Sequence, residues 1–111
     1  MTELSTHAFQ TLDSGIRVEE GTVVPYYLTV QKTRIALARV DGRLYAFHDL
    51  CTCSEPSCPL SGGLLTGQTV MCQCHGSRFD ITTGAVLDGP ATAPIAVFES
   101  QETDGHIRVR L

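Results

Sequence analysis

At 111 residues the chain suffices for one folded domain, and its 42% hydrophobic and 18% charged residues are typical of a globular protein. The net charge of −4 and the eight scattered Lys and Arg residues leave no basic patch for phosphates, so we expect no nucleic-acid partner. We find neither a signal peptide nor an apolar run of about 20 residues that could cross a bilayer. We therefore expect a single domain over residues 1–111, no association with a membrane, and a cytoplasmic location.

The first half of the chain is predicted to form short strands. Residues 23–30, 34–40 and 43–48 are rich in β-branched, aromatic and aliphatic side chains, which is typical of strands. Asp41-Gly42 lies between the last two and is a strong signal for a tight β-hairpin.

A second hairpin is predicted at the other end of the chain. Residues 95–99 and 106–111 form its strands, and Asp104-Gly105 forms its turn. The alternation of side chains in the last strand places three apolar residues on one face: Ile107, Val109 and Leu111.

The pattern as a whole predicts an all-β fold. No window of a dozen residues has a helical period, and turn signals recur about every 8 to 12 residues, as in an antiparallel β-sandwich or barrel. Between the two hairpins, residues 50–92 are rich in glycine and are predicted to form a loop-rich subdomain mounted on the sheet. Sites are often built on such loops because a rigid scaffold can hold them in place.

All five cysteines lie within this middle segment, between Cys51 and Cys74. A secreted disulfide framework would spread its cysteines along the chain, so the clustering points to a bound metal. Two short segments offer ligands: C-x-C at 51–53 and C-x-x-H at 72–75. Thiolate and imidazole ligands suit zinc and iron–sulfur clusters alike. The spacing therefore leaves both possibilities open.

The residues around these cysteines resemble a known family. The stretch CQCHGSRFDITTG, followed by LDGPA, is similar to the second cluster-binding loop and the proline loop of Rieske iron–sulfur proteins. The similarity extends upstream through VDGRLYAFHDLCT. It implies a Rieske-like fold with a [2Fe-2S] cluster, in which two Cys hold one iron and two His hold the outer iron.

Carried over by position, the resemblance implies that Cys51 and Cys72 bind the inner iron and that His75 binds the outer iron. Cys53 departs from the pattern because it stands where the family has its first histidine. One interpretation is a cluster with three Cys ligands and one His, as in CDGSH-type proteins. The other is that Cys53 is a bystander and that the cluster is broken or absent.

The remaining two cysteines are Cys58 and Cys74. In Rieske proteins of the cytochrome bc complexes, equivalent cysteines form a disulfide that joins the two cluster loops, so the resemblance implies a Cys58–Cys74 disulfide. Because disulfides are uncommon in the cytosol, two reduced thiols are the alternative.

The resemblance also implies how the cluster is tuned. Ser77 matches a hydroxyl that donates to a bridging sulfide, whereas Phe79 replaces a tyrosine that high-potential members use as a donor. A lost donor destabilises the reduced cluster and lowers its potential. Pro90 lies in the loop that covers the cluster.

These inferences predict a small electron carrier that catalyses no bond chemistry itself. By analogy with soluble Rieske ferredoxins, its partners would be a reductase and a terminal oxygenase or another multicomponent oxidoreductase. One alternative is a structural zinc module for protein interaction. Another is a small subunit of a nitrite reductase-like complex, in which the same fold often survives without its cluster ligands. The presence of Cys51, Cys72 and His75 argues against this alternative.

Overall fold

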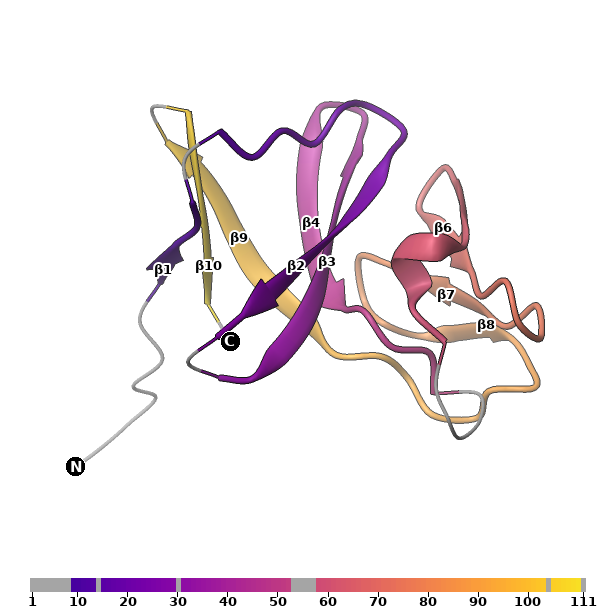
Figure 1. Ribbon diagram of the computed structural model, residues 1–111. Coiled ribbons are helices and arrows are strands. Elements are labelled where there is room, and N and C mark those ends of the chain that lie inside the picture. Colours follow the sequence, from indigo (N-terminus) through magenta and orange to yellow (C-terminus); the bar gives the residue numbers. More distant parts are fainter. Residues whose placement is uncertain (1–8, 14, 30, 53–57, 104, 111) are drawn as a thin grey trace.

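The computed structural model describes residues 9–13, 15–29, 31–52, 58–103 and 105–110, and consists of two antiparallel sheets (Figure 1). The large sheet is curled and has six strands in the order β1 (Gln10–Thr11), β10 (His106–Arg110), β9 (Val97–Thr103), β4 (Arg43–His48), β3 (Thr33–Val40), β2 (Val23–Leu28). The small sheet has four strands in the order β5 (Leu64–Thr66), β6 (Thr69–Met71), β7 (Arg78–Asp80), β8 (Val86–Asp88). The predicted all-β fold is confirmed.

The first predicted hairpin is present as β3 and β4. Val40 pairs with Arg43, so the turn consists of Asp41 and Gly42 alone. Both turn residues have positive φ, 53° and 79°, as a two-residue turn of type I′ requires. The strand before it, β2, ends at Leu28, and residue 30 of the predicted strand lies outside the described residues.

The second predicted hairpin is present as β9 and β10, but with different bounds. The first strand begins at Val97 rather than at residue 95 and continues to Thr103, which pairs with His106. Ile95 is not part of β9, because its N–H donates to the carbonyl of Gly84, next to the small sheet, at 2.9 Å. Ile107 and Val109 are buried as predicted, whereas Leu111 lies outside the described residues.

Two hydrophobic cores lie on opposite faces of the large sheet, and β3 contributes to both. Ile35 and Leu37 face the core inside the curl of the sheet. Ala36 and Ala38 face the second core, which lies toward the small sheet. The four residues are fully buried because both faces of the strand are covered.

The second core connects the large sheet to the predicted loop-rich segment. Phe47 of β4 packs in the same cluster as Val70 and Phe79 of the small sheet, together with the cysteines Cys51 and Cys72. Short strands therefore occupy much of the segment that the sequence predicts as loops. Among the described residues, no helix is long and apolar enough to cross a membrane.

Candidate metal centre

The first cysteine loop leaves the large sheet just after β4 and is closed at its base by backbone pairing. The N–H of Cys51 donates to the carbonyl of Cys58 at 2.8 Å, and Leu50 forms a β-bridge with Pro59. A short 3-10 turn, η1 (Leu60–Gly62), follows and leads into the small sheet. Cys53 lies outside the described residues, which omit 53–57.

The second cysteine loop connects β6 and β7 and is closed in a similar way. The N–H of Cys72 donates to the carbonyl of Ser77 at 2.8 Å, and the N–H of Gly76 donates back to Cys72 at 3.0 Å. Gly76 has a φ of 79°, which glycine adopts without the strain that a Cβ would cause. This tight loop buries Cys72 and leaves His75 exposed at its end.

A third segment, residues 89–93, connects these two loops. The N–H of Ala91 donates to Oγ of Ser77 at 3.0 Å, and Oγ1 of Thr52 donates to the carbonyl of Ala93 at 2.6 Å. This segment contains Pro90, which is exposed and follows a cis peptide bond after Gly89. The first loop, the second loop and the predicted proline loop therefore lie together.

A disulfide joins Cys58 of the first loop to Cys74 of the second, with their Cα atoms 6.4 Å apart. The Sγ atoms of Cys58, Cys72 and Cys74 all lie within 4.8 Å of one another. Because two of these three sulfurs are bonded to each other, the group cannot supply three thiolates to a metal. The bond instead places Cys72 beside the junction of the two loops.

The burial of the predicted ligands differs from one side of the site to the other. Cys51 and Cys72 are 1% and 0% exposed and belong to the core between the two sheets. His75 is exposed. Two buried thiols and an exposed imidazole fit a two-iron group with a buried inner iron and an outer iron near the surface. Which residues hold the irons remains a prediction.

The two predicted tuning residues are fully buried. Ser77 accepts a hydrogen bond from the N–H of Ala91, and its hydroxyl proton can still be donated to another acceptor such as a sulfide. Phe79 packs in the core with both buried cysteines, so it has a packing role in addition to the tuning role that we predict.

Asp49 is a residue of this region that sequence reasoning missed. Its side chain is fully buried and contacts Ser61 and Arg34. An aspartate in a loop ordinarily faces water, and no periodicity marks it as buried. Its place two residues before Cys51 is the one signal that could have drawn attention to it.

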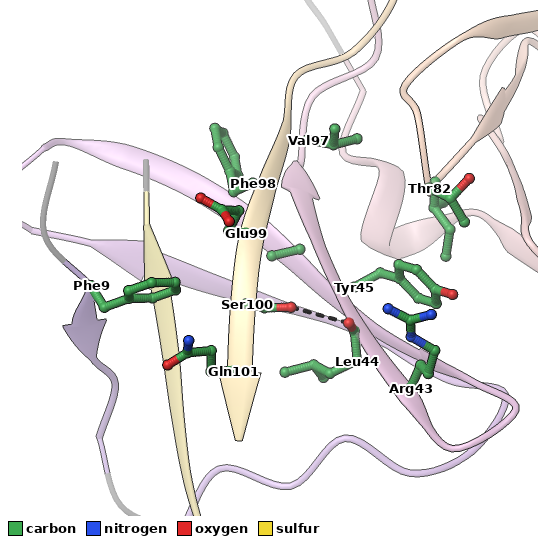
Figure 2. Close-up of a pocket in the computed structure, with 12 residues that line it drawn as sticks. Phe9, Arg43, Leu44, Tyr45, Thr82, Val97, Phe98, Glu99, Ser100 and Gln101 are labelled. Atoms are coloured by element: carbon green, nitrogen blue, oxygen red, sulfur yellow. Dashed lines mark hydrogen bonds between the residues drawn. The ribbon is translucent and has the colours of Figure 1, made fainter. Parts of the chain in front are cut away.

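A hollow of about 410 Å³ lies on the large sheet where β4 and β9 separate (Figure 2). Oγ of Ser100 donates to the carbonyl of Leu44 at 3.0 Å across this gap. None of the predicted ligands and tuning residues that the structure describes lines the hollow. The hollow is therefore separate from the candidate metal centre.

Comparisons with known proteins agree with this geometry. A family model described as the Rieske [2Fe-2S] domain matches residues 10–99. The ferredoxin CarAc of Metapseudomonas resinovorans is 37% identical over 75 residues, which are 68% of each chain. A Sphingomonas yanoikuyae B1 ferredoxin superposes with a TM-score of 0.81 at 27% identity, covering 94% of this chain and 99% of that one.

A further match is a chain from the complex of reduced oxygenase and oxidized ferredoxin in carbazole 1,9a-dioxygenase. It superposes with a TM-score of 0.78 at 29% identity, covering 92% of each chain. The family match spans most of the chain and includes both cysteine loops. This protein therefore belongs to the Rieske [2Fe-2S] domain family and is an electron carrier of the ferredoxin type, with a [2Fe-2S] cluster as its cofactor.

Proposed function

We propose that the chain carries single electrons from a reductase to a terminal oxygenase of a ring-hydroxylating dioxygenase system. CarAc is a ferredoxin, and two further relatives, at 38% and 36% identity, are ferredoxin components of naphthalene 1,2-dioxygenase systems, which supports this assignment. When bound, the cluster supplies a site that takes up and releases one electron. The observation that carries the proposal is the exposed His75 at the end of a loop whose Cys72 is buried.

In this proposal Cys51 and Cys72 hold the inner iron, and Cys53 and His75 hold the outer iron. The exposed imidazole brings one edge of the site to the surface, where a partner protein can approach it. The other edge, at Cys51 and Cys72, is buried in the core and so shielded from water. The assignment of Cys53 rests on its position in the C-x-C segment and on the affinity of thiolates for iron.

We further propose that residues 1–111 form one Rieske-type domain with a cluster-binding subdomain at about 50–92, and that the protein works in the cytoplasm. The disulfide is compatible with that compartment because the bond joins two loops that a bound cluster would also hold together. The subdomain is supported by the separate pairing of β5 to β8.

Iron analysis, sulfide analysis and EPR of the purified protein test the cluster assignment. We expect two irons and two acid-labile sulfides per chain, and an EPR signal in the reduced state. Stoichiometric zinc without sulfide would contradict the assignment. The carrier role is tested by adding the protein to a ferredoxin reductase and a ring-hydroxylating oxygenase, where turnover should depend on its concentration.

A further inference from the structure

Asp49 carries a fully buried carboxylate that accepts hydrogen bonds from three donors. Oδ1 accepts from the backbone N–H of Ser61 at 2.6 Å, and Oδ2 accepts from Oγ of Ser61 at 2.8 Å. Oδ2 also accepts from Nε of Arg34 at 2.5 Å. A buried charge is tolerated only where partners of this kind replace water. The three residues Asp49, Arg34 and Ser61 are called the loop clasp below.

The loop clasp connects the large sheet to both sides of the first cysteine loop. Asp49 directly follows β4, and its backbone N–H donates to the carbonyl of Arg34 on β3 at 3.1 Å. Its own carbonyl accepts from the N–H of Leu60 at 2.6 Å. Asp49 therefore contacts the strand from which the loop departs and, through Leu60 and Ser61, the turn η1 to which the loop returns.

The loop clasp is the first of three successive contacts between the two sides of the first cysteine loop. Next along the chain come the bridge between Leu50 and Pro59 and the bond from Cys51 to Cys58. In the part of the first loop that the structure describes, the bond from Cys51 to Cys58 is the last backbone contact between its two sides. Each of these contacts keeps the two sides of the loop aligned for the next one. Loosening the contacts of Asp49 therefore releases the backbone that positions the thiol of Cys51.

We propose that Asp49 is a positioning residue of the cluster site. Its carboxylate holds the base of the first loop closed and so limits the rate at which the loop releases the cluster. The proposal rests on the assignment of Cys51 as an iron ligand. Asp49→Asn preserves the shape of the side chain, but it removes the charge that pairs with Arg34 and turns an amide N–H₂ toward a donor.

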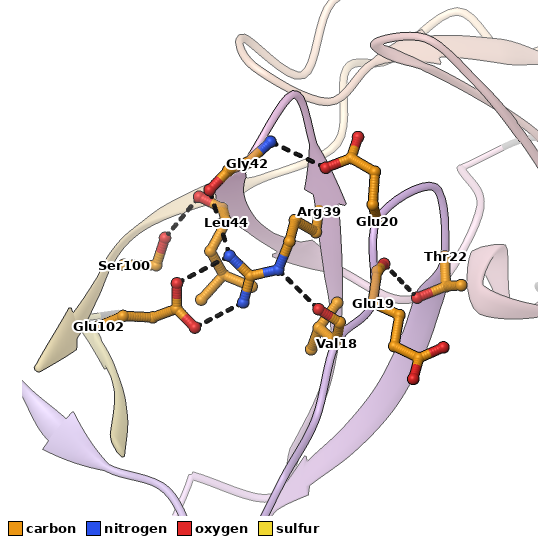
Figure 3. A network of polar contacts seen from close by, with 9 residues as sticks. All are labelled: Val18, Glu19, Glu20, Thr22, Arg39, Gly42, Leu44, Ser100 and Glu102. Atoms are coloured by element: carbon orange, nitrogen blue, oxygen red, sulfur yellow. Dashed lines mark hydrogen bonds and ion pairs between the residues drawn. The ribbon is translucent and has the colours of Figure 1, made fainter. Parts of the chain in front are cut away.

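Glu102→Gln provides a matched control at the other end of β3. Glu102 also pairs with an arginine of this strand, Arg39, through hydrogen bonds of 2.8 and 2.5 Å (Figure 3). Arg39 and Arg34 lie roughly 16 Å apart along the strand at about 3.3 Å per residue. The control therefore removes a more exposed carboxylate–arginine contact of the large sheet without touching the cysteine loop.

Native-state hydrogen exchange and cluster release by an iron chelator test the proposal on the purified, cluster-loaded chain. In Asp49→Asn we expect the amides of Cys51 and Leu60 to exchange about tenfold faster or more, because a hydrogen bond to a charged group is lost. The amide of Leu12, bonded to Ile107 in the large sheet at 2.8 Å, should keep its rate. Cluster release should be faster by a similar factor. The reduction potential should shift upward because a negative charge near the cluster is removed.

Glu102→Gln should leave the two loop amides, the release rate and the potential unchanged. Unchanged exchange at Cys51 and Leu60 in Asp49→Asn would overturn the proposal, and so would an equal acceleration at Leu12, which would mean general destabilisation. If Asp49→Asn does not fold, Ser61→Ala is used instead. The exchange rates of the Cys51 and Leu60 amides are again compared with that of Leu12, and a smaller acceleration of exchange is expected. If the unsubstituted chain binds no cluster, the proposed function fails, while the exchange rates of the two loop amides still decide whether Asp49 holds the base of the first loop closed.

Discussion

The large sheet and the region of the small sheet are stabilised in different ways. The large sheet uses strands as long as eight residues, and residues 35–38 of β3 are fully buried between two apolar cores. The small sheet has strands of three residues each, and a disulfide, glycine turns and a few polar contacts hold its loops. Two buried cores support the first region, whereas the second shares only one of them and depends in addition on individual contacts. The cluster site should therefore fail without unfolding the sheet that carries it.

The sharpest test of this difference is Cys72→Ala, which removes one of the two buried thiols. We expect complete loss of the cluster, because three remaining ligands cannot complete two four-coordinate irons. Iron content and visible absorbance measure that loss. Far-UV circular dichroism should still report a folded β-protein, since the core inside the curl of the large sheet does not contain Cys72. A variant that retains its full iron content would show that Cys72 is not a ligand.

Cys53→His should produce the next largest effect. A thiolate adds one negative charge compared with a neutral imidazole. At roughly 5 Å and an effective dielectric constant near 20, this charge disfavours reduction by on the order of 3 kcal/mol. For a one-electron couple this is roughly 140 mV, so the potential of Cys53→His should be higher by about that amount. Voltammetry of both forms measures the shift. Equal potentials would show that Cys53 does not bind the reducible iron.

Replacing Cys58 by Ser removes the bond between the two cysteine loops. The two cysteines are 16 positions apart in sequence, and a disulfide closing a loop of that size stabilises by about 3 kcal/mol in the chain-entropy model. We expect faster cluster loss on mild heating, measured by bleaching of the visible absorbance. Cys74→Ser should behave in the same way, because it removes the same bond. Mass spectrometry that found both thiols reduced in the unsubstituted protein would remove the basis of this prediction.

The large sheet and the region of the small sheet also differ in how much of each could be predicted from the sequence. Asp41-Gly42 and the alternation around it predicted the first hairpin because turn chemistry and burial are local signals. The predicted start of β9 at residue 95 was wrong because Ile95 makes its backbone contact with Gly84, a partner outside the predicted hairpin. The loop clasp of Asp49 was missed for a related reason, since only the folded chain brings Arg34 and Ser61 to it.

The cysteine loops were located from motif resemblance rather than from periodicity. The short strands between and after them carry too few residues to show an alternation, so this segment was expected to be rich in loops. The disulfide between Cys58 and Cys74, implied by the resemblance, is present in the structure. The ligand set itself stays a prediction, and Cys53 lies outside the described residues.

Gly84→Ala tests the junction between the two regions. A Cβ at this position would overlap the carbonyl oxygen of Ile95, and the φ of 86° disfavours any side chain. We expect a loss of about 2 to 3 kcal/mol in the free energy of unfolding. Gly67→Ala is the control, because its φ of 57° is also positive but the space around it is open. It should cost about 1 kcal/mol. Equal costs in chemical denaturation would show that the contact with Ile95 is unimportant.

The smallest expected effects come from two carboxyl groups, one in each region. Asp80 is the last residue of β7 in the small sheet. The side-chain hydroxyl of Thr82, and to a lesser extent its backbone N–H, donates to Asp80 and lowers the pKa of that carboxyl. In the large sheet the guanidinium of Arg39 donates to Glu102 and lowers the pKa of Glu102. Both carboxyls therefore favour the folded state in their charged form.

The direction of the pH effect follows from these lowered pKa values. A carboxyl with a lower pKa in the folded state stabilises the protein above its unfolded pKa, near 4, and loses that contribution as the pH falls through the folded pKa. Asp80→Asn and Glu102→Gln should each cost at most about 1 kcal/mol at pH 7, because solvent weakens such contacts at the surface. Thermal midpoints of both variants, measured against pH, should converge with those of the unsubstituted chain in acid.

The two variants should still differ in one respect. Asp80→Asn loosens the β7–β8 turn and speeds cluster release, whereas Glu102→Gln lowers the thermal midpoint without changing the release rate. If both variants changed release equally, the two regions would open together, and the site would not be separable from the sheet.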